Sequence, residues 1–169
     1  LYTYHYDHRF RLIEKHVPGA GVTHIVYDAL NRPVLSQSAN LRSTHEWMFT
    51  KYDQFDRPVM SGLFDAAAAY AVWNPGGVKP PLSRGVVQGW ADANSFSGVS
   101  NSDPLWEAPS NVQYTTWHGY THRVFPQGYC SVHTANYYDD YDFNHDGSPD
   151  YSFIVDVGSA LYPQAAAPY

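Results

Sequence analysis

Side chains that carry oxygen are concentrated in one short segment, residues 142–150, which reads Asp-Phe-Asn-His-Asp-Gly-Ser-Pro-Asp. In a calcium-binding loop, oxygen ligands come from alternating positions, and a glycine at the sixth position allows the chain to turn sharply. The spacing therefore predicts a Ca²⁺ site with a structural role. Its predicted ligands are the side chains of Asp142, Asn144, Asp146 and Asp150, together with the backbone carbonyl of Ser148.

This segment differs from an EF-hand, because its twelfth position is Phe153 where that motif has a bidentate Glu. Pro149 would interrupt a helix, and residues 151–157 alternate as a strand does. The alternative is a hairpin turn whose Asp and Asn side chains accept backbone N–H groups without a metal. The carboxylates repel one another, and a cation would relieve that repulsion. Both interpretations remain open at this stage.

Two other pairs of residues have the types, but not the context, of a catalytic or zinc site. His118 and His122 are spaced as in a helical zinc motif, but the Glu of His-Glu-x-x-His is absent and the intervening residues favour strand or turn. Cys130 and His133 match a nucleophile and a base in residue type only. We therefore predict that the chain is not an enzyme.

Composition excludes several classes of protein. The chain of 169 residues has a formal net charge of −6, and its acidic excess lies in residues 65–169. Nucleic-acid binding needs clustered Lys and Arg, so it is not expected. Residues 66–73 form the longest apolar run, which is too short to span a membrane. The single cysteine excludes an internal disulfide.

Residue types favour a mainly β protein. Aromatic residues make up 17% of the chain, and Tyr, Val and Thr, which suit strands, are abundant. Lys and Glu, which favour surface helices, are scarce. One short helix is predicted around residues 65–73, beginning at an Asp65 N-cap and ending before the Asn-Pro-Gly-Gly run at 74–77.

A pattern of the form Tyr-Asp-x-x-x-Arg-[Leu/Pro] occurs three times in the first third of the chain, at residues 6–12, 27–33 and 52–58. An extended segment precedes each Tyr, and a second one follows each Arg. The Asp can open a tight turn by accepting backbone N–H groups. The residue before the Arg would then be left-handed, which suits Asn31 and Asp56 but not Phe10. Each repeat is therefore predicted to be an antiparallel β-hairpin that buries its apolar face by stacking on its neighbours.

The repeated residues are predicted to be structural, since they recur with each hairpin. They are Tyr6, Asp7, Arg11, Tyr27, Asp28, Arg32, Tyr52, Asp53 and Arg57.

These repeats resemble the YD repeat of the Rhs family, whose usual unit reads Tyr-Asp-x-x-Gly-Arg-Leu. Residues 47–62 are similar to Rhs-repeat proteins of the Bacteroidetes, and so are residues 11–19 and parts of 119–141. The glycine of the family unit is missing from all three repeats, which affects the expected turn geometry. The resemblance implies a curved ribbon of hairpins that forms part of a hollow shell.

In bacterial members of this family the shell often encloses a C-terminal toxin. Three units cannot close a shell, so the resemblance implies that this chain is one arc of the wall of a longer, secreted or surface-exposed bacterial protein. The implied partners are the rest of that parent chain, an enclosed toxin, and a protein partner in secretion or at the cell surface.

The sequence suggests four segments: YD-repeat hairpins at 1–64, an insertion at 65–116, a β segment with the acidic loop at 117–157, and a linker-like tail at 158–169. The insertion matches no motif. Trp73, Trp90, Trp106 and Trp117 lie in it or beside it. An aromatic surface of this kind supports an alternative function, an adhesin-like module that binds a glycan or a protein.

Overall fold

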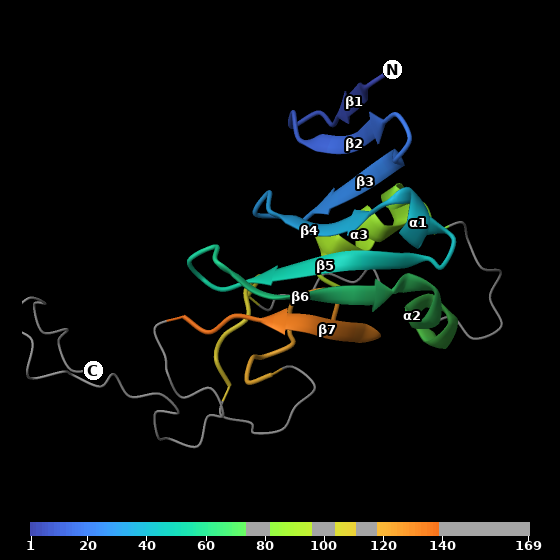
Figure 1. Ribbon diagram of the computed structural model, residues 1–169. Helices are drawn as coiled ribbons and strands as arrows, with labels where there is room; N and C mark the ends of the chain where they lie inside the picture. Colours follow the sequence, from blue (N-terminus) through green and yellow to red (C-terminus); the bar gives the residue numbers. More distant parts are fainter. Residues whose placement is uncertain (74–81, 96–103, 111–117, 139–169) are drawn as a thin grey trace, which may run out of the picture.

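A computed structural model describes residues 1–73, 82–95, 104–110 and 118–138. Seven antiparallel strands form one sheet in which every strand pairs with its neighbours in the sequence (Figure 1). The prediction of a mainly β protein is confirmed. The strands are β1 (Thr3–Tyr6), β2 (Leu12–Val17), β3 (Gly21–Tyr27), β4 (Pro33–Gln37), β5 (Glu46–Tyr52), β6 (Pro58–Asp65) and β7 (Cys130–Ala135).

Three hairpins, β1–β2, β3–β4 and β5–β6, contain the three sequence repeats. In each, the strand register shifts at the Tyr that ends the first strand. The residue before each Arg is left-handed, with φ of 59° at Phe10, 65° at Asn31 and 61° at Asp56. Phe10 adopts this conformation despite its poor fit, and its ring is 88% exposed. The turn geometry is therefore set by the Asp and Arg contacts around this position and does not require glycine.

The expectation of a single helix is wrong. The predicted helix is present as α2 (Ala66–Trp73), and Asp65 caps it by accepting the N–H of Ala68 at 2.8 Å. Two more helices are present among the described residues, α1 (Ala39–Arg42) and α3 (Arg84–Ala93). Helix α3 contains two glycines and is amphipathic, and it is stabilised by packing more than by intrinsic propensity.

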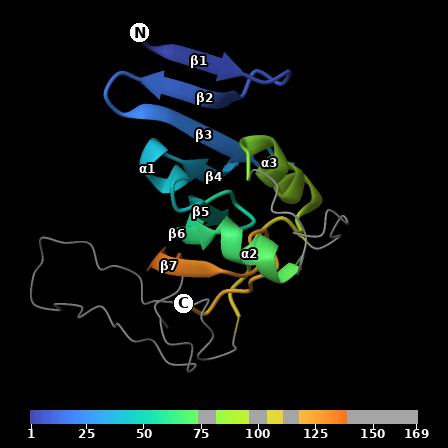
Figure 2. The same cartoon turned by 90° about the vertical axis from the view of Figure 1, so that its right-hand side faces the viewer.

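The hydrophobic core lies on one face of the sheet. Along β5, the side chains of Trp47, Phe49 and Lys51 are buried, whereas Met48 between them is 48% exposed. Helix α3 packs on this face beside β3 and contributes Val87, Trp90 and Ala91 to the core (Figure 2). Phe125 also belongs to the core, and its ring centroid lies 5.6 Å from that of Phe64.

Strand β7 continues the sheet although 64 residues separate it from β6. A register shift occurs at Ser61 and Gly62, where β6 pairs with β7. A Cβ atom on Gly62 would lie 2.0 Å from the carbonyl oxygen of Ser131, so only glycine fits there. Within the described part of the chain, no helix is both long and apolar enough to cross a bilayer.

Candidate functional site

Each hairpin turn is closed by an ion pair between the Asp and the Arg of its repeat. In the second turn, Oδ1 of Asp28 accepts the backbone N–H groups of Leu30 and Arg32 at 3.0 and 2.9 Å. Oδ2 of Asp28 accepts the Nε–H of Arg32 at 2.7 Å. Asp7 and Asp53 make the equivalent three bonds in the first and third turns, which again include Arg Nε at 2.7 Å. Because each carboxylate satisfies two turn N–H groups and one guanidinium, it fixes both the turn and the direction of the Arg.

The Arg of each hairpin then reaches the next unit along the sheet, where its guanidinium lies over a tyrosine ring; this unit is the next hairpin for Arg11 and Arg32, and the segment after β7 for Arg57. Such cation–π contacts are favourable within about 6 Å. The distances from guanidinium carbon to ring centroid are 4.8 Å for Arg11 and Tyr27, 4.9 Å for Arg32 and Tyr52, and 4.4 Å for Arg57 and Tyr138.

The same tyrosines bond back to the preceding hairpin. Each donates its hydroxyl proton to the carbonyl of the residue that follows the Arg: Tyr27 to Leu12 at 2.9 Å, Tyr52 to Pro33 at 2.9 Å, and Tyr138 to Pro58 at 3.1 Å. Successive hairpins are therefore joined by two reciprocal side-chain contacts. We refer to this series of Arg–Tyr contacts as the ladder.

Tyr138 is a fourth member of the ladder that sequence analysis did not identify. It comes after the end of β7, whereas Tyr6, Tyr27 and Tyr52 each end their strands, and Asp139 comes next in the sequence. The repeat pattern breaks after that dipeptide, because Phe143 stands where the Arg would be. The Tyr-Asp dipeptide shortly after a strand, without the Arg, is the signal in the sequence that marks it.

Tyr6 occupies the first ladder position, at the end of β1. Strand β1 is the outermost strand of the sheet, and among the described residues no hairpin precedes it. The Tyr6 side chain is 58% exposed, and neighbouring Tyr4 is also exposed. The ladder is therefore open at this end of the described structure.

This geometry lowers the pKa of the turn carboxylates Asp7 and Asp53. Desolvation alone would raise the pKa of Asp7, but the hydrogen bonds from Arg11 and Arg9 outweigh it and lower the pKa to about 2. At Asp53, desolvation is likewise outweighed by hydrogen bonds from Arg57 and Phe55, and the pKa is lowered. These carboxylates are therefore ionised at neutral pH.

A buried ion pair fastens the segments 104–110 and 118–124 to the sheet. Nζ of Lys51 donates to Oε1 of Glu107 at 2.7 Å and to the carbonyl of Val124 at 2.9 Å. Both charged side chains have 0% exposure. Glu107 also accepts the hydroxyl proton of Thr121 at 2.6 Å. Burial lowers the pKa of Lys51, while the adjacent carboxylate acts in the opposite direction.

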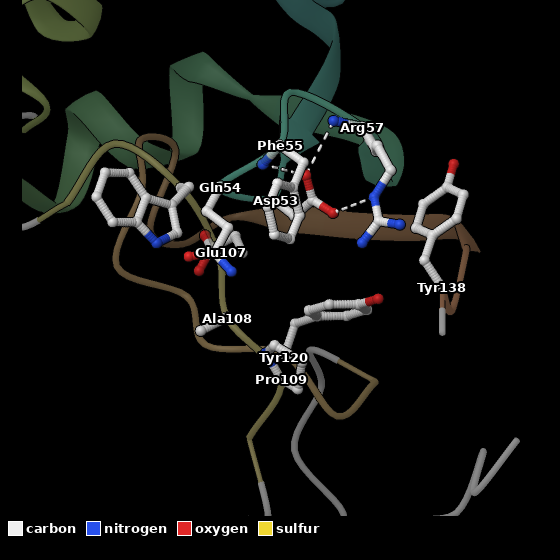
Figure 3. Close-up of a pocket in the computed structure, with 10 residues that line it drawn as sticks. Asp53, Gln54, Phe55, Arg57, Glu107, Ala108, Pro109, Tyr120 and Tyr138 are labelled. Carbon is white, nitrogen blue, oxygen red and sulfur yellow. Dashed lines mark hydrogen bonds and ion pairs between the residues drawn. The ribbon is translucent and has the colours of Figure 1, made fainter. Parts of the chain in front are cut away.

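A cavity of about 170 Å³ lies at the third turn, between the hairpin and residues 106–109. Its walls include Phe55, Trp106 and Tyr120, and the Asp53–Arg57 pair lines it on one side. In Figure 3 the Tyr120 ring faces that pair across the cavity, and Tyr138 lies on the other side of Arg57. The cavity combines aromatic surface with a fixed and partly exposed ion pair.

The sequence candidates for catalysis are not assembled into a site. His118 is left-handed, with φ of 49°, and residues 118–122 form no helix, so the two histidines lack the geometry of the helical zinc motif. Burial raises the pKa of Cys130 to about 12, which keeps its thiol protonated and poorly nucleophilic. Among the described residues, no group of three His, Cys, Asp or Glu side chains is placed to hold a metal ion.

Two further sequence predictions have different outcomes. The predicted calcium ligands Asp142, Asn144, Asp146, Ser148 and Asp150 lie outside the described residues. Of the tryptophans considered for an aromatic binding surface, Trp90 is in the core, Trp73 is the last residue of α2, and Trp106 lines the cavity. Trp117 is outside the described residues.

Comparison with known proteins identifies no matching family, no similar curated protein and no similar solved structure.

Proposed function

We propose that this chain is a structural, non-enzymatic segment of a longer Rhs/YD-repeat protein that is secreted or displayed on the bacterial surface. In this proposal its hairpins form one arc of the wall of a β-shell, and the shell encloses a toxin segment at the C-terminus of the same polypeptide. The repeat pattern and the ladder support the proposal.

The observation that carries the proposal is the directional repetition of the ladder. Arg11 and Arg32 each contact the Tyr of the following hairpin, Arg57 contacts Tyr138 after β7, and each of these Tyr residues bonds back to the preceding hairpin. A contact that repeats with the same partners and direction can extend to any number of units, as in other repeat proteins. The Asp and Arg chemistry that is repeated in each turn also joins neighbouring units, and a wall built of hairpins requires such a contact.

Under this proposal, the exposed tyrosine at the first ladder position is where an upstream hairpin would pack. Tyr6 matches Tyr27 and Tyr52 in its position but is mostly exposed. An upstream hairpin with the same Tyr-Asp-x-x-x-Arg pattern would supply a guanidinium to cover the Tyr6 ring and a carbonyl to accept its hydroxyl proton. It would also pair with the backbone of β1, which is a free sheet edge within the described structure.

The first test is the intact mass of the natural polypeptide, with peptide mapping of both ends. We expect it to extend upstream of Leu1 and to contain further Tyr-Asp-x-x-x-Arg units there. A natural polypeptide that begins at Leu1, or whose upstream residues contain no such unit, would overturn the proposal.

A pair of variants tests the contact itself. In the natural polypeptide, Tyr6→Phe should lower the free energy of unfolding by about 0.5–1.5 kcal/mol, as Tyr27→Phe should, because each loses one hydrogen bond. In the 169-residue chain, Tyr27→Phe should still destabilise, whereas Tyr6→Phe should have no effect. Equal effects of Tyr6→Phe in the two polypeptides would contradict the presence of an upstream hairpin.

A further inference from the structure

We propose that the cavity at the third turn binds a single pyranose ring of a neutral glycan. This role is independent of the wall proposal, since it needs only the third turn and the residues that face it.

The first argument is the chemistry of the cavity walls. Phe55, Trp106 and Tyr120 contribute ring surface, and Pro109 adds apolar surface. The faces of aromatic rings carry partial negative charge. The C–H groups of a pyranose are polarised by neighbouring oxygens, so they pack favourably on such faces. Aromatic walls of this kind would leave the hydroxyl groups of the sugar directed to the rim.

The second argument is the set of polar groups at the same cavity. A carboxylate offers about four acceptor positions, and the turn of the third repeat uses three of those on Asp53. The exposed amide of Gln54 supplies both donors and an acceptor. Asp53 and Arg57 neutralise each other, so the polar side suits uncharged hydroxyls better than an anion.

The third repeat differs from the other two in the exposure of its Arg side chain, while its Asp53 side chain is nearly buried, at 9% exposure. The Arg side chain is 33% exposed at Arg57, compared with 9% at Arg32 and 14% at Arg11. Arg32 also donates to the carbonyl of Leu105 and to the carboxylate of Asp56, and these two contacts hold the second turn against other segments of the same chain. Among the described residues, the third turn is where the partly exposed Arg of an Asp–Arg pair lines a cavity together with Trp106.

The cavity is also rigid, which reduces the entropy lost on binding. Tyr120 stacks on Tyr137 with ring centroids 5.8 Å apart, and its hydroxyl donates to the carbonyl of Asn136 at 2.6 Å. A second wall is fixed at Glu107, which forms the buried pair with Lys51 and whose backbone N–H donates to the carbonyl of Tyr52 at 2.9 Å. The volume of about 170 Å³ is below the range of about 300–1,000 Å³ for sites that hold drug-sized ligands, so one ring is the appropriate size.

The test is a titration of the 169-residue chain with the methyl pyranosides of glucose, galactose, mannose and N-acetylglucosamine, followed by saturation-transfer NMR and tryptophan fluorescence. We expect saturable binding of at least one of them with a Kd of about 1 mM, as is reasonable for a single small ring. Benzoate and indole serve as aromatic probes of the same size. Binding of these probes without binding of any pyranoside would overturn the proposal, and so would no saturable binding at all.

Two matched variants locate the site. Phe55→Ala removes a cavity wall, and because this side chain is 66% exposed the variant should fold. It should weaken pyranoside binding about two- to tenfold, from the loss of one aromatic contact. Leu30→Ala changes the equivalent position of the second turn, which is also exposed but does not line the cavity, and should leave the Kd unchanged. Equal affinities of the wild type and Phe55→Ala would place the sugar elsewhere and contradict the proposal.

Discussion

Arg32 lies over the ring of Tyr52, with its guanidinium carbon 4.9 Å from the ring centroid, although the two residues belong to different hairpins. The contact depends on Asp28, which holds the Nε of Arg32 at 2.7 Å and so directs the guanidinium toward the next strand pair. Turn closure and contact between hairpins therefore use the same arginine. A substitution of Asp28 or Arg32 should therefore weaken both the turn and the contact with the next hairpin.

Asp28→Asn tests this dependence. The Asp28 and Arg32 side chains are nearly buried, at 4% and 9% exposure, and among the described residues the substitution leaves Arg32 with Asp56, at an exposed position, as its remaining carboxylate partner. We expect a loss of about 1.5–3 kcal/mol in the free energy of unfolding, as for a lost hydrogen bond to a charged group, measured by urea denaturation.

Asp56→Asn is the matched control for that variant. Asp56 accepts NH1 of Arg32 at 2.8 Å from an exposed position, and Asn31 performs the same role for Arg11 in the preceding unit at 3.2 Å. An amide oxygen is therefore sufficient there, and the expected change is within about 1 kcal/mol. Equal losses for the two substitutions would contradict a specific role of the buried pair.

Acid should weaken the turns in a defined pH range. The pKa of Asp7 is about 2 in the folded chain and that of Asp53 is also lowered, whereas an unfolded Asp has a pKa of about 3.9. The unfolded state binds protons first, so the stabilisation is fully present above about pH 4 and is lost as pH falls toward 2. Urea denaturation at several pH values should show this decrease, and it should be smaller in Asp7→Asn/Asp53→Asn. An identical pH dependence in that double variant would show that other carboxylates are responsible.

Removing one charge of the Lys51–Glu107 pair should lower the free energy of unfolding more than removing both charges does. Lys51→Met leaves the Glu107 carboxylate buried and unpaired, so we expect a loss of about 3–5 kcal/mol in the free energy of unfolding. Adding Glu107→Gln removes the second charge and keeps an acceptor for Thr121. The double variant should therefore be more stable than Lys51→Met alone, as measured by urea denaturation. If the second substitution lowered stability further, the buried charge would not be the source of the loss.

The sequence could predict those features that depend on contacts between residues close together in the chain. The three turns use contacts within five residues, so the Tyr-Asp-x-x-x-Arg spacing was enough to place each Asp, the left-handed residue and the hairpin. Helix α2 was equally local, with Asp65 as its cap. These features follow from short-range geometry and backbone hydrogen bonding.

Features that depend on distant residues were not predicted. Glu107 had no signal in its own segment, because its partner Lys51 lies 56 residues away on β5. Helix α3 was missed because Gly85 and Gly89 weaken its intrinsic propensity, and the core contacts of Val87 and Trp90 compensate. The cavity likewise required two segments, the third turn and residues 106–109, to be brought together by folding.

Gly62 should be essential for the pairing of β7. A methyl group at this position would approach the Ser131 carbonyl oxygen to 2.0 Å, and a backbone atom cannot move aside as a flexible side chain can. Gly62→Ala should cost about 1–3 kcal/mol and increase amide hydrogen exchange in β7. Gly89→Ala on α3 is the control, because its new methyl group would meet nothing within 4 Å and should stabilise the helix by about 1 kcal/mol. Unchanged exchange in β7 of Gly62→Ala would contradict the close packing.

Calcium binding by the acidic segment rests on the sequence and predicts a change in stability. Asp142, Asp146 and Asp150 place three carboxylates close together in the chain, and a cation that binds only the folded form should add to its stability. At a hundredfold excess of Ca²⁺ over Kd the gain is about 2.7 kcal/mol. EDTA should therefore lower the Tm by several degrees and added Ca²⁺ should restore it. Asp146→Ala should have the lower Tm and no response to either reagent, whereas Asp92→Ala, which changes an acidic residue of α3, should respond as the wild type does. An unchanged Tm with EDTA, together with no heat of Ca²⁺ binding by calorimetry, would favour the metal-free turn.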